Sequence, residues 1–161
     1  MIISGVVGNI GNSPVLKSVD WLMLEWYEAG KRILHKHTQG GREIMMRFLN
    51  QHDGLQAGDI IYEDADLVIA VDILVCDAIS VKPKSMFEMA AICYEIGNKH
   101  LPIFYQDDEV LVAFEPPLFR VLTNAGYGPK RENRKLINPI KTTVLPHGNM
   151  MFDKNANIEN P

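Results

Sequence analysis

The amino-acid sequence predicts two small domains, an all-β domain of the barrel or sandwich type followed by an α+β domain of ferredoxin-like βαββαβ order. Three observations predict this arrangement. Short stretches that alternate between apolar and polar residues fill positions 1–73, and the first strong helix signals appear only after residue 80. Beyond residue 141 the sequence becomes polar and rich in Asn, with little to bury. The expected units are therefore 1–73, 74–141 and a flexible tail, 142–161.

The first half of the chain is predicted to consist of short antiparallel strands. Positions 21–27 and 31–36 alternate in the way that half-buried strands do. Turn-forming residues separate such stretches at hairpin spacing, and Gly supplies the positive φ that other residues avoid. These turns are expected at 28–30, 40–41, 53–54 and 63–66. Strand-like runs at 67–71 and 78–81 flank a hinge near Cys76-Asp77, which marks the change to the second domain.

A capping box predicts where the first helix begins. The Ser85 hydroxyl can accept a hydrogen bond from the Glu88 amide, and the Glu88 carboxylate can accept one from the Ser85 amide. The residues that follow form an apolar face at helical spacing. Its members are Phe87, Ala90, Ala91 and Tyr94, with Met86 and Cys93 beside them. Gly97 is the expected C′ residue, which places His100 three positions beyond the end of the helix.

The remaining elements complete the ferredoxin-like order. A strand at 101–105, a turn at 106–108 and a partner strand at 110–114 form a hairpin. The Pro116-Pro117 pair can open a second helix that closes near Gly126. A last strand at 135–140 gives the βαββαβ sequence of elements.

Composition and charge exclude several functional classes. The net charge of −4 argues against a phosphate-binding surface, so nucleic acid is not an expected partner. No apolar run reaches the roughly 18 residues that a membrane span needs. Cys76 and Cys93 lie in apolar patterns, and the N-terminus lacks the features of a secretion signal, so a reducing cytoplasm is the expected compartment.

An enzyme is not expected, because the sequence has no nucleophile elbow, Walker A loop, His-Glu-x-x-His or Cys-x-x-Cys motif. His100 could still serve as a general base with Glu95 or Asp107, and this alternative stays open. His35 and His37 lie two apart on a predicted strand, so they share a face and could chelate weakly, although ordinary surface histidines are the simpler interpretation. His52 is expected in a solvated turn.

One segment resembles the signature of a known family. The stretch Tyr94-Glu95-Ile96-Gly97-Asn98-Lys99-His100, preceded by Lys82-Pro83-Lys84-Ser85-Met86, is similar to the motif of the UreE urease accessory proteins, which usually ends Gly-Asn-Arg-His. The similarity extends through 1–9, 20–33 and 58–63, and covers the chain to about Gly126. It implies an N-terminal domain related to peptide-binding domains and a C-terminal metal-binding domain that dimerises.

The resemblance also implies a nickel site. The histidine that matches His100 would face its symmetry mate, so that a homodimer, or a metal-bridged dimer of dimers, shares one Ni(II). His147 in the tail would complete the coordination, and Zn(II) or Cu(II) would fit the same imidazoles. The implied partners are the urease accessory GTPase UreG and the apo-urease complex, and the implied function is delivery of nickel to the urease active site.

Two departures and one rival interpretation qualify this expectation. The strand at 110–114 carries no histidine and the tail lacks a long histidine run, so little extra metal capacity is expected. Lys99 stands where the family motif has Arg, which changes hydrogen-bond geometry but not the ligand. The rival is a peptide-binding or co-chaperone module that has no role in metal transfer.

Overall fold

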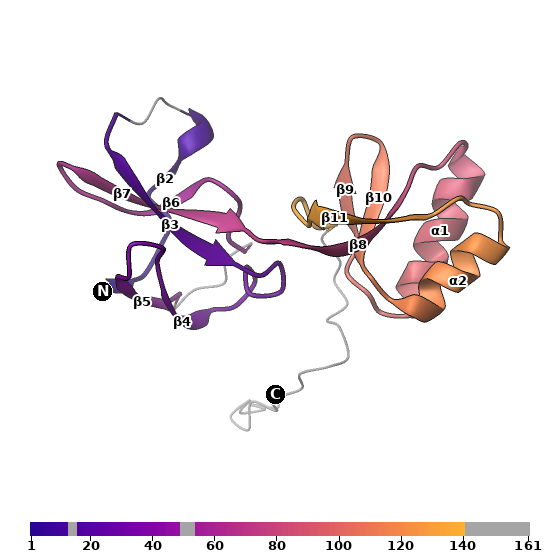
Figure 1. Cartoon of the computed structure of the whole chain (residues 1–161), viewed down its shortest axis with the longest axis horizontal. Helices are drawn as coiled ribbons and strands as arrows, with labels where there is room; N and C mark the ends of the chain where they lie inside the picture. Colours follow the sequence, from indigo (N-terminus) through magenta and orange to yellow (C-terminus); the bar gives the residue numbers. More distant parts are fainter. Residues whose placement is uncertain (13–15, 49–53, 141–161) are drawn as a thin grey trace, which may run out of the picture.

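The computed structural model describes residues 1–12, 16–48 and 54–140, which form two lobes joined by an extended strand connection (Figure 1). Each lobe has its own buried apolar cluster. The prediction of an all-β domain followed by an α+β domain is therefore confirmed. The predicted tail at 142–161, with its His147, and the predicted turn histidine His52 lie outside the described residues.

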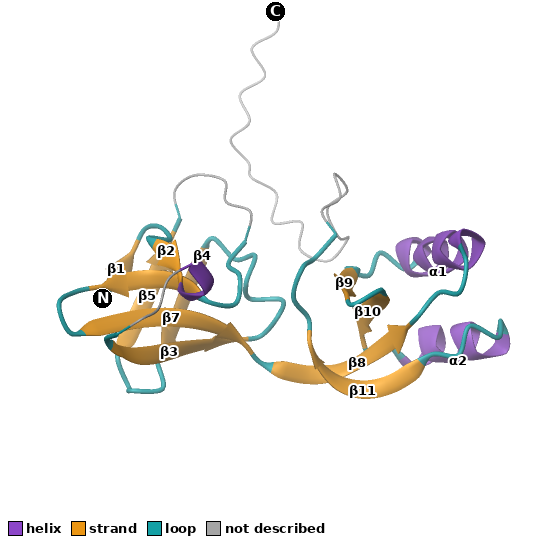
Figure 2. Cartoon of the chain, turned by 90° about the horizontal axis from the view of Figure 1, so that it is seen from above, coloured by secondary structure: helices purple, strands orange, loops and turns teal. Residues whose placement is uncertain are grey.

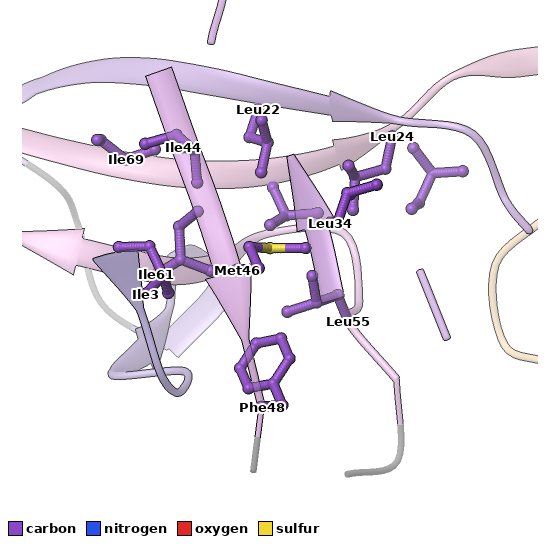
Figure 3. Packing of buried hydrophobic residues seen from close by; sticks show 12 residues of the cluster. Ile3, Leu22, Leu24, Leu34, Ile44, Met46, Phe48, Leu55, Ile61 and Ile69 are labelled. Atoms are coloured by element: carbon purple, nitrogen blue, oxygen red, sulfur yellow. The ribbon is translucent and has the colours of Figure 1, made fainter. Parts of the chain in front are cut away.

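The first lobe contains two sheets that pack around one core. Its elements are β1 (Ile2–Ile3), β2 (Gly8–Asn9), a 3₁₀ turn (Ile10–Asn12), β3 (Ser18–Leu24), β4 (Ile33–His37), β5 (Glu43–Arg47), β6 (Asp59–Glu63) and β7 (Leu67–Ile73). The sheets have the strand orders β1-β5-β4 and β2-β6-β7-β3. Figure 3 shows Met46 of β5 among Leu22, Leu34 and Leu55 in the core between them.

Two strand pairings differ from the antiparallel arrangement that the sequence predicts. β1 pairs with β5 in parallel, and β3 pairs with β7 in parallel over its whole length. Parallel neighbours require a long connection, and in both cases the intervening chain contains other strands. Short-range turn signals cannot reveal such pairings, because they report only on neighbours in the sequence.

A buried carboxylate anchors the β4–β5 hairpin to β3. Asp20 is 7% exposed and accepts hydrogen bonds from Thr38 Oγ1 at 2.7 Å and from the Gly40 amide at 2.8 Å, while Arg42 Nη1 pairs with it. Burial alone would raise the pKa of the Asp20 carboxyl, but these three donors hold it below its ordinary value. The turn of the hairpin is therefore fixed by charge-assisted hydrogen bonds.

Replacing Asp20 by Asn should lower the free energy of unfolding at pH 7 by about 2 kcal/mol, because charge-assisted hydrogen bonds lose their acceptor charge. Since the folded pKa is lowered, the contribution of Asp20 is present above the unfolded pKa of about 3.9 and disappears as pH falls through the folded value. Urea denaturation of both proteins between pH 7 and pH 3 should show the difference shrinking at the acidic end. A difference that stays constant over this range would contradict the assignment.

The second lobe has the βαββαβ order that the sequence predicts. Its elements are β8 (Val75–Val81), α1 (Met86–Asn98), β9 (Phe104–Gln106), β10 (Glu109–Ala113), α2 (Pro116–Asn124) and β11 (Lys130–Lys135). The antiparallel sheet has the order β11-β8-β10-β9, and both helices cover one of its faces (Figure 2). Asp107 and Asp108 both have positive φ, as a two-residue hairpin turn between β9 and β10 requires.

Two details of the second lobe were predicted wrongly. The hinge expected at Cys76-Asp77 lies inside β8, and only Leu74 separates β7 from β8. The last strand is 130–135 and not 135–140. It is almost entirely charged and is held at the sheet edge by backbone pairing with β8, so an apolar pattern could not locate it.

The two lobes contact each other through side chains that cross in both directions. Trp26, which follows β3, packs edge-to-face on Phe104 with ring centroids 5.7 Å apart, on the sheet face opposite the helices. Ile137 packs against the core of the first lobe, and Lys135 Nζ lies 2.6 Å from the Asp72 carboxylate. The junction at Leu74 is therefore reinforced by apolar and charged contacts.

Candidate metal centre

The helix that leads to His100 begins at the predicted cap. Ser85 is the N-cap residue of α1, and its hydroxyl accepts a hydrogen bond from the Glu88 amide at 3.1 Å. The Glu88 carboxylate closes the cap one residue earlier than predicted, because it accepts from the Lys84 amide at 2.8 Å and not from that of Ser85. The start of the helix is thus fixed by two side-chain hydrogen bonds.

The face of α1 that packs on the sheet is different from the apolar face that the sequence predicts. Ile92 and Ile96 are fully buried against the sheet and α2, with Met89 and Cys93 beside them. Burial raises the pKa of the Cys93 thiol, which fits its role as a small packed side chain. Phe87 and Tyr94, which we expected on the packed face, are 78% and 69% exposed.

The end of α1 is a Schellman motif, and His100 occupies its C′ position. The helix runs to Asn98 and is capped by Lys99, so Gly97 lies inside the helix and the predicted stop there is wrong. The His100 amide donates to Gly97 O at 2.9 Å, and the Leu101 amide donates to Ile96 O at 3.4 Å. These are the two bonds that define the motif.

His100 takes a backbone conformation that histidine rarely adopts. Its φ is 54°, in the left-handed region that the C′ position demands and that glycine normally occupies. For a residue with a β-carbon this conformation costs roughly 1–2 kcal/mol. The side chain is exposed at the surface, so core packing does not repay that cost. A strained, exposed histidine at a well-defined helix end is the pattern expected of a functional residue.

Charged groups next to His100 connect the end of α1 with the start of α2. Lys99 Nζ lies 3.8 Å from the Glu115 carboxylate, which also accepts a hydrogen bond from the Leu118 amide at 2.6 Å and so caps α2. Asp107 lies in the β9–β10 turn, and Glu95 lies within α1.

A single described chain does not contain a complete metal site. Across residues 1–12, 16–48 and 54–140, no three His, Cys, Asp or Glu side chains are placed to hold an ion together. A metal ion bound at His100 would therefore need further ligands from outside the described residues of one chain. The second predicted ligand, His147, lies outside the described residues.

Comparisons with known proteins assign the chain to a family. A family model described as the UreE urease accessory protein, N-terminal domain, matches residues 3–74, and the corresponding C-terminal model matches residues 76–136. The chain belongs to the UreE family. A urease accessory protein UreE of Flavobacterium johnsoniae is 45% identical over 98% of this chain and 99% of its own length.

Other UreE proteins extend the comparison. One from Actinobacillus pleuropneumoniae is 39% identical over 82% of this chain and 75% of its own. Another from Acetivibrio thermocellus is 37% identical over 87% of this chain and 92% of its own. The resemblance inferred from the motif ending at His100 is confirmed, and UreE proteins are accessory proteins of urease, so the prediction that the chain is not an enzyme is confirmed as well.

The described helices are also informative about membranes. Within the described residues, neither α1 nor α2 combines the length and the apolar character that crossing a bilayer would require.

Proposed function

We propose that this UreE protein is a nickel metallochaperone, in which His100 from two chains binds one Ni(II) ion that is then delivered for assembly of the urease active site. The observation that carries the proposal is the exposed imidazole of His100 at a position where glycine would be more stable. Backbone strain that is retained at an exposed side chain points to a selected function of that side chain.

Symmetry would turn this single histidine into a pair of ligands. In a two-fold dimer each residue near the axis meets its own copy, so two His100 imidazoles can share one ion. The exposed apolar side chains of Phe87 and Tyr94 on α1 support a dimer in which this helix contributes to the interface. Burying them against a second copy would remove from water a surface that one chain leaves exposed.

The ligand set suits a protein that must release its ion. Two imidazoles match Ni(II) well but leave positions for water, so they hold the ion less firmly than a closed four-ligand site. A tethered His147 would raise the affinity through its high effective concentration and could detach when the ion leaves. Zn(II) and Cu(II) would also fit these ligands, so the availability of each metal in the cell would determine which ion is bound.

The partners in this proposal follow from the urease role. UreG and the apo-urease complex would receive the ion in the cytoplasm, without nucleic acid or a membrane as partner. To test delivery, the nickel-loaded protein is added to apo-urease with its accessory GTPase in the presence of a chelator that removes free nickel. Wild type should restore urease activity, whereas His100→Gly should give no more activity than the chelated control.

The rival, a peptide-binding module without a metal role, makes the opposite prediction for the same assay. In that case the His100→Gly protein would restore urease activity as well as wild type does, because its first lobe is unchanged. That outcome would contradict the nickel-delivery proposal.

A further inference from the structure

A second pair of histidines lies in the first lobe, on a strand that the nickel proposal does not use. In β4 the side chains alternate, so that Leu34 points into the core while His35 and His37 lie on the exposed face. The two imidazole rings have centroids 6.2 Å apart and are inclined at 39°. Adjacent same-face positions on one strand thus present two nitrogen ligands to solvent side by side.

The neighbouring strand adds a carboxylate to this pair. Glu43 of β5 is the direct partner of His37 in the strand register, and its Oε1 atom lies 2.7 Å from Nε2 of His35. The side chains of His35 and Glu43 are 53% and 63% exposed, so an ion can approach from solvent. Three potential ligands therefore share one face of the β4–β5 strand pair.

The backbone beneath these ligands is held firmly. On the opposite face of the hairpin Ile44 and Met46 are buried in the core at 1% and 0% exposure. Asp20 fixes the turn between β4 and β5 through the hydrogen bonds described above. The strands therefore set the spacing of the ligands, and only side-chain rotation is needed to adjust it.

We propose that His35, His37 and Glu43 form a second site for a divalent transition-metal ion, separate from His100. Imidazole and carboxylate are ligands that Zn(II), Ni(II) and Cu(II) accept, and three of them leave coordination positions open to water. In the part of the chain that the structure describes, no three His, Cys, Asp or Glu side chains are already placed around one ion position. The three proposed ligands must therefore move closer together to bind an ion. Two imidazoles on one tetrahedral ion have ring centroids about 5 Å apart, so the rings must approach by about 1 Å.

The existing contact between His35 and Glu43 does not oppose this rearrangement. It is an exposed pair, and exposed pairs contribute little to stability. The Glu43 carboxylate can bind the ion directly. Alternatively, it can accept a hydrogen bond from the imidazole nitrogen that does not bind the ion. Either way its negative charge lies beside the ion, so loss of the charge should weaken binding.

The test uses the full-length chain with His100→Gly, so that the proposed nickel ligand of the second lobe cannot contribute. Zn(II) alone is titrated into it by calorimetry, and a site on the first lobe should bind one ion per chain. Adding His37→Asn or His35→Asn should weaken that binding at least about 10-fold, and Glu43→Gln several-fold. Ile33→Ala, on the same strand and face, is the matched control and should leave the isotherm unchanged.

A second measurement locates the ion. In the His100→Gly protein, substoichiometric Cu(II) should broaden the amide NMR signals of 33–37 and 43–45 before others, and His37→Asn should abolish this selectivity. Absence of zinc binding, equal isotherms in all variants, or broadening elsewhere would overturn the second site. None of these results tests the proposed nickel site, because binding at that site is measured in protein that retains His100.

Discussion

Replacing His100 by Gly should lower Ni(II) affinity by at least about 100-fold while leaving the free energy of unfolding within about 1 kcal/mol of wild type. The affinity falls because both imidazoles of a symmetric pair disappear, a larger loss than the 10–100-fold typical of removing a supporting group around a metal. Stability is preserved because two effects of glycine oppose each other. Glycine relieves the backbone strain of the folded state at φ 54°, but it also increases the conformational entropy of the unfolded chain. Nickel calorimetry and urea denaturation of the same preparations measure both quantities.

His100→Ala is the control that separates ligation from backbone strain. Alanine removes the imidazole but keeps a β-carbon in the left-handed conformation, so it should lose nickel binding equally and be less stable than the Gly variant by about 1 kcal/mol. If His100→Gly were instead destabilised by several kcal/mol, the imidazole would have a structural role. Unchanged nickel affinity in both variants would contradict ligation by His100.

Replacing Phe87 by Asp should convert the proposed dimer into monomers and weaken nickel binding with it. Phe87 is 78% exposed on α1, and in a two-fold interface the change occurs twice. If each copy costs about 2 kcal/mol, as truncation of an interface anchor does, the dissociation constant rises by roughly 1,000-fold. Light scattering of the variant with and without Ni(II) measures the change.

Leu16→Asp is the matched control for this substitution. Leu16 is 98% exposed in the first lobe, so the same type of change from an exposed apolar residue to a carboxylate is made away from α1. The Leu16→Asp protein should have the same oligomeric state by light scattering and the same nickel affinity as wild type. A Phe87→Asp protein that remains dimeric, or that becomes monomeric yet binds nickel as tightly as wild type, would remove α1 from the proposed interface.

The sequence predicted those parts of the fold that depend on local signals. The capping residue Ser85 marks the start of α1 correctly, because its hydrogen bond is made within one turn. The two-domain arrangement and the βαββαβ order also follow from patterns a few residues long. His100 could be singled out as a candidate from the motif that it ends.

Other features depend on contacts between distant residues and could not be predicted in this way. α1 is apolar on two faces, so periodicity alone selected the face with Phe87 and Tyr94, although Ile92 and Ile96 are the ones that pack. The helix ends at a Schellman motif whose C′ residue is a histidine, and a rule that looks for glycine there stops the helix too early. The charged strand β11 owes its place to its partner β8.

The most direct test of the shared His100 site is the stoichiometry of tight nickel binding. Equilibrium dialysis of the wild-type protein at low free Ni(II), with its mass determined in parallel by light scattering, gives the number of ions per chain. A dimer that holds one ion for every two chains, and loses it on His100→Gly, is the predicted result. One tightly bound ion per chain, or tight binding by a monomer, would contradict a nickel ion held between two copies of His100.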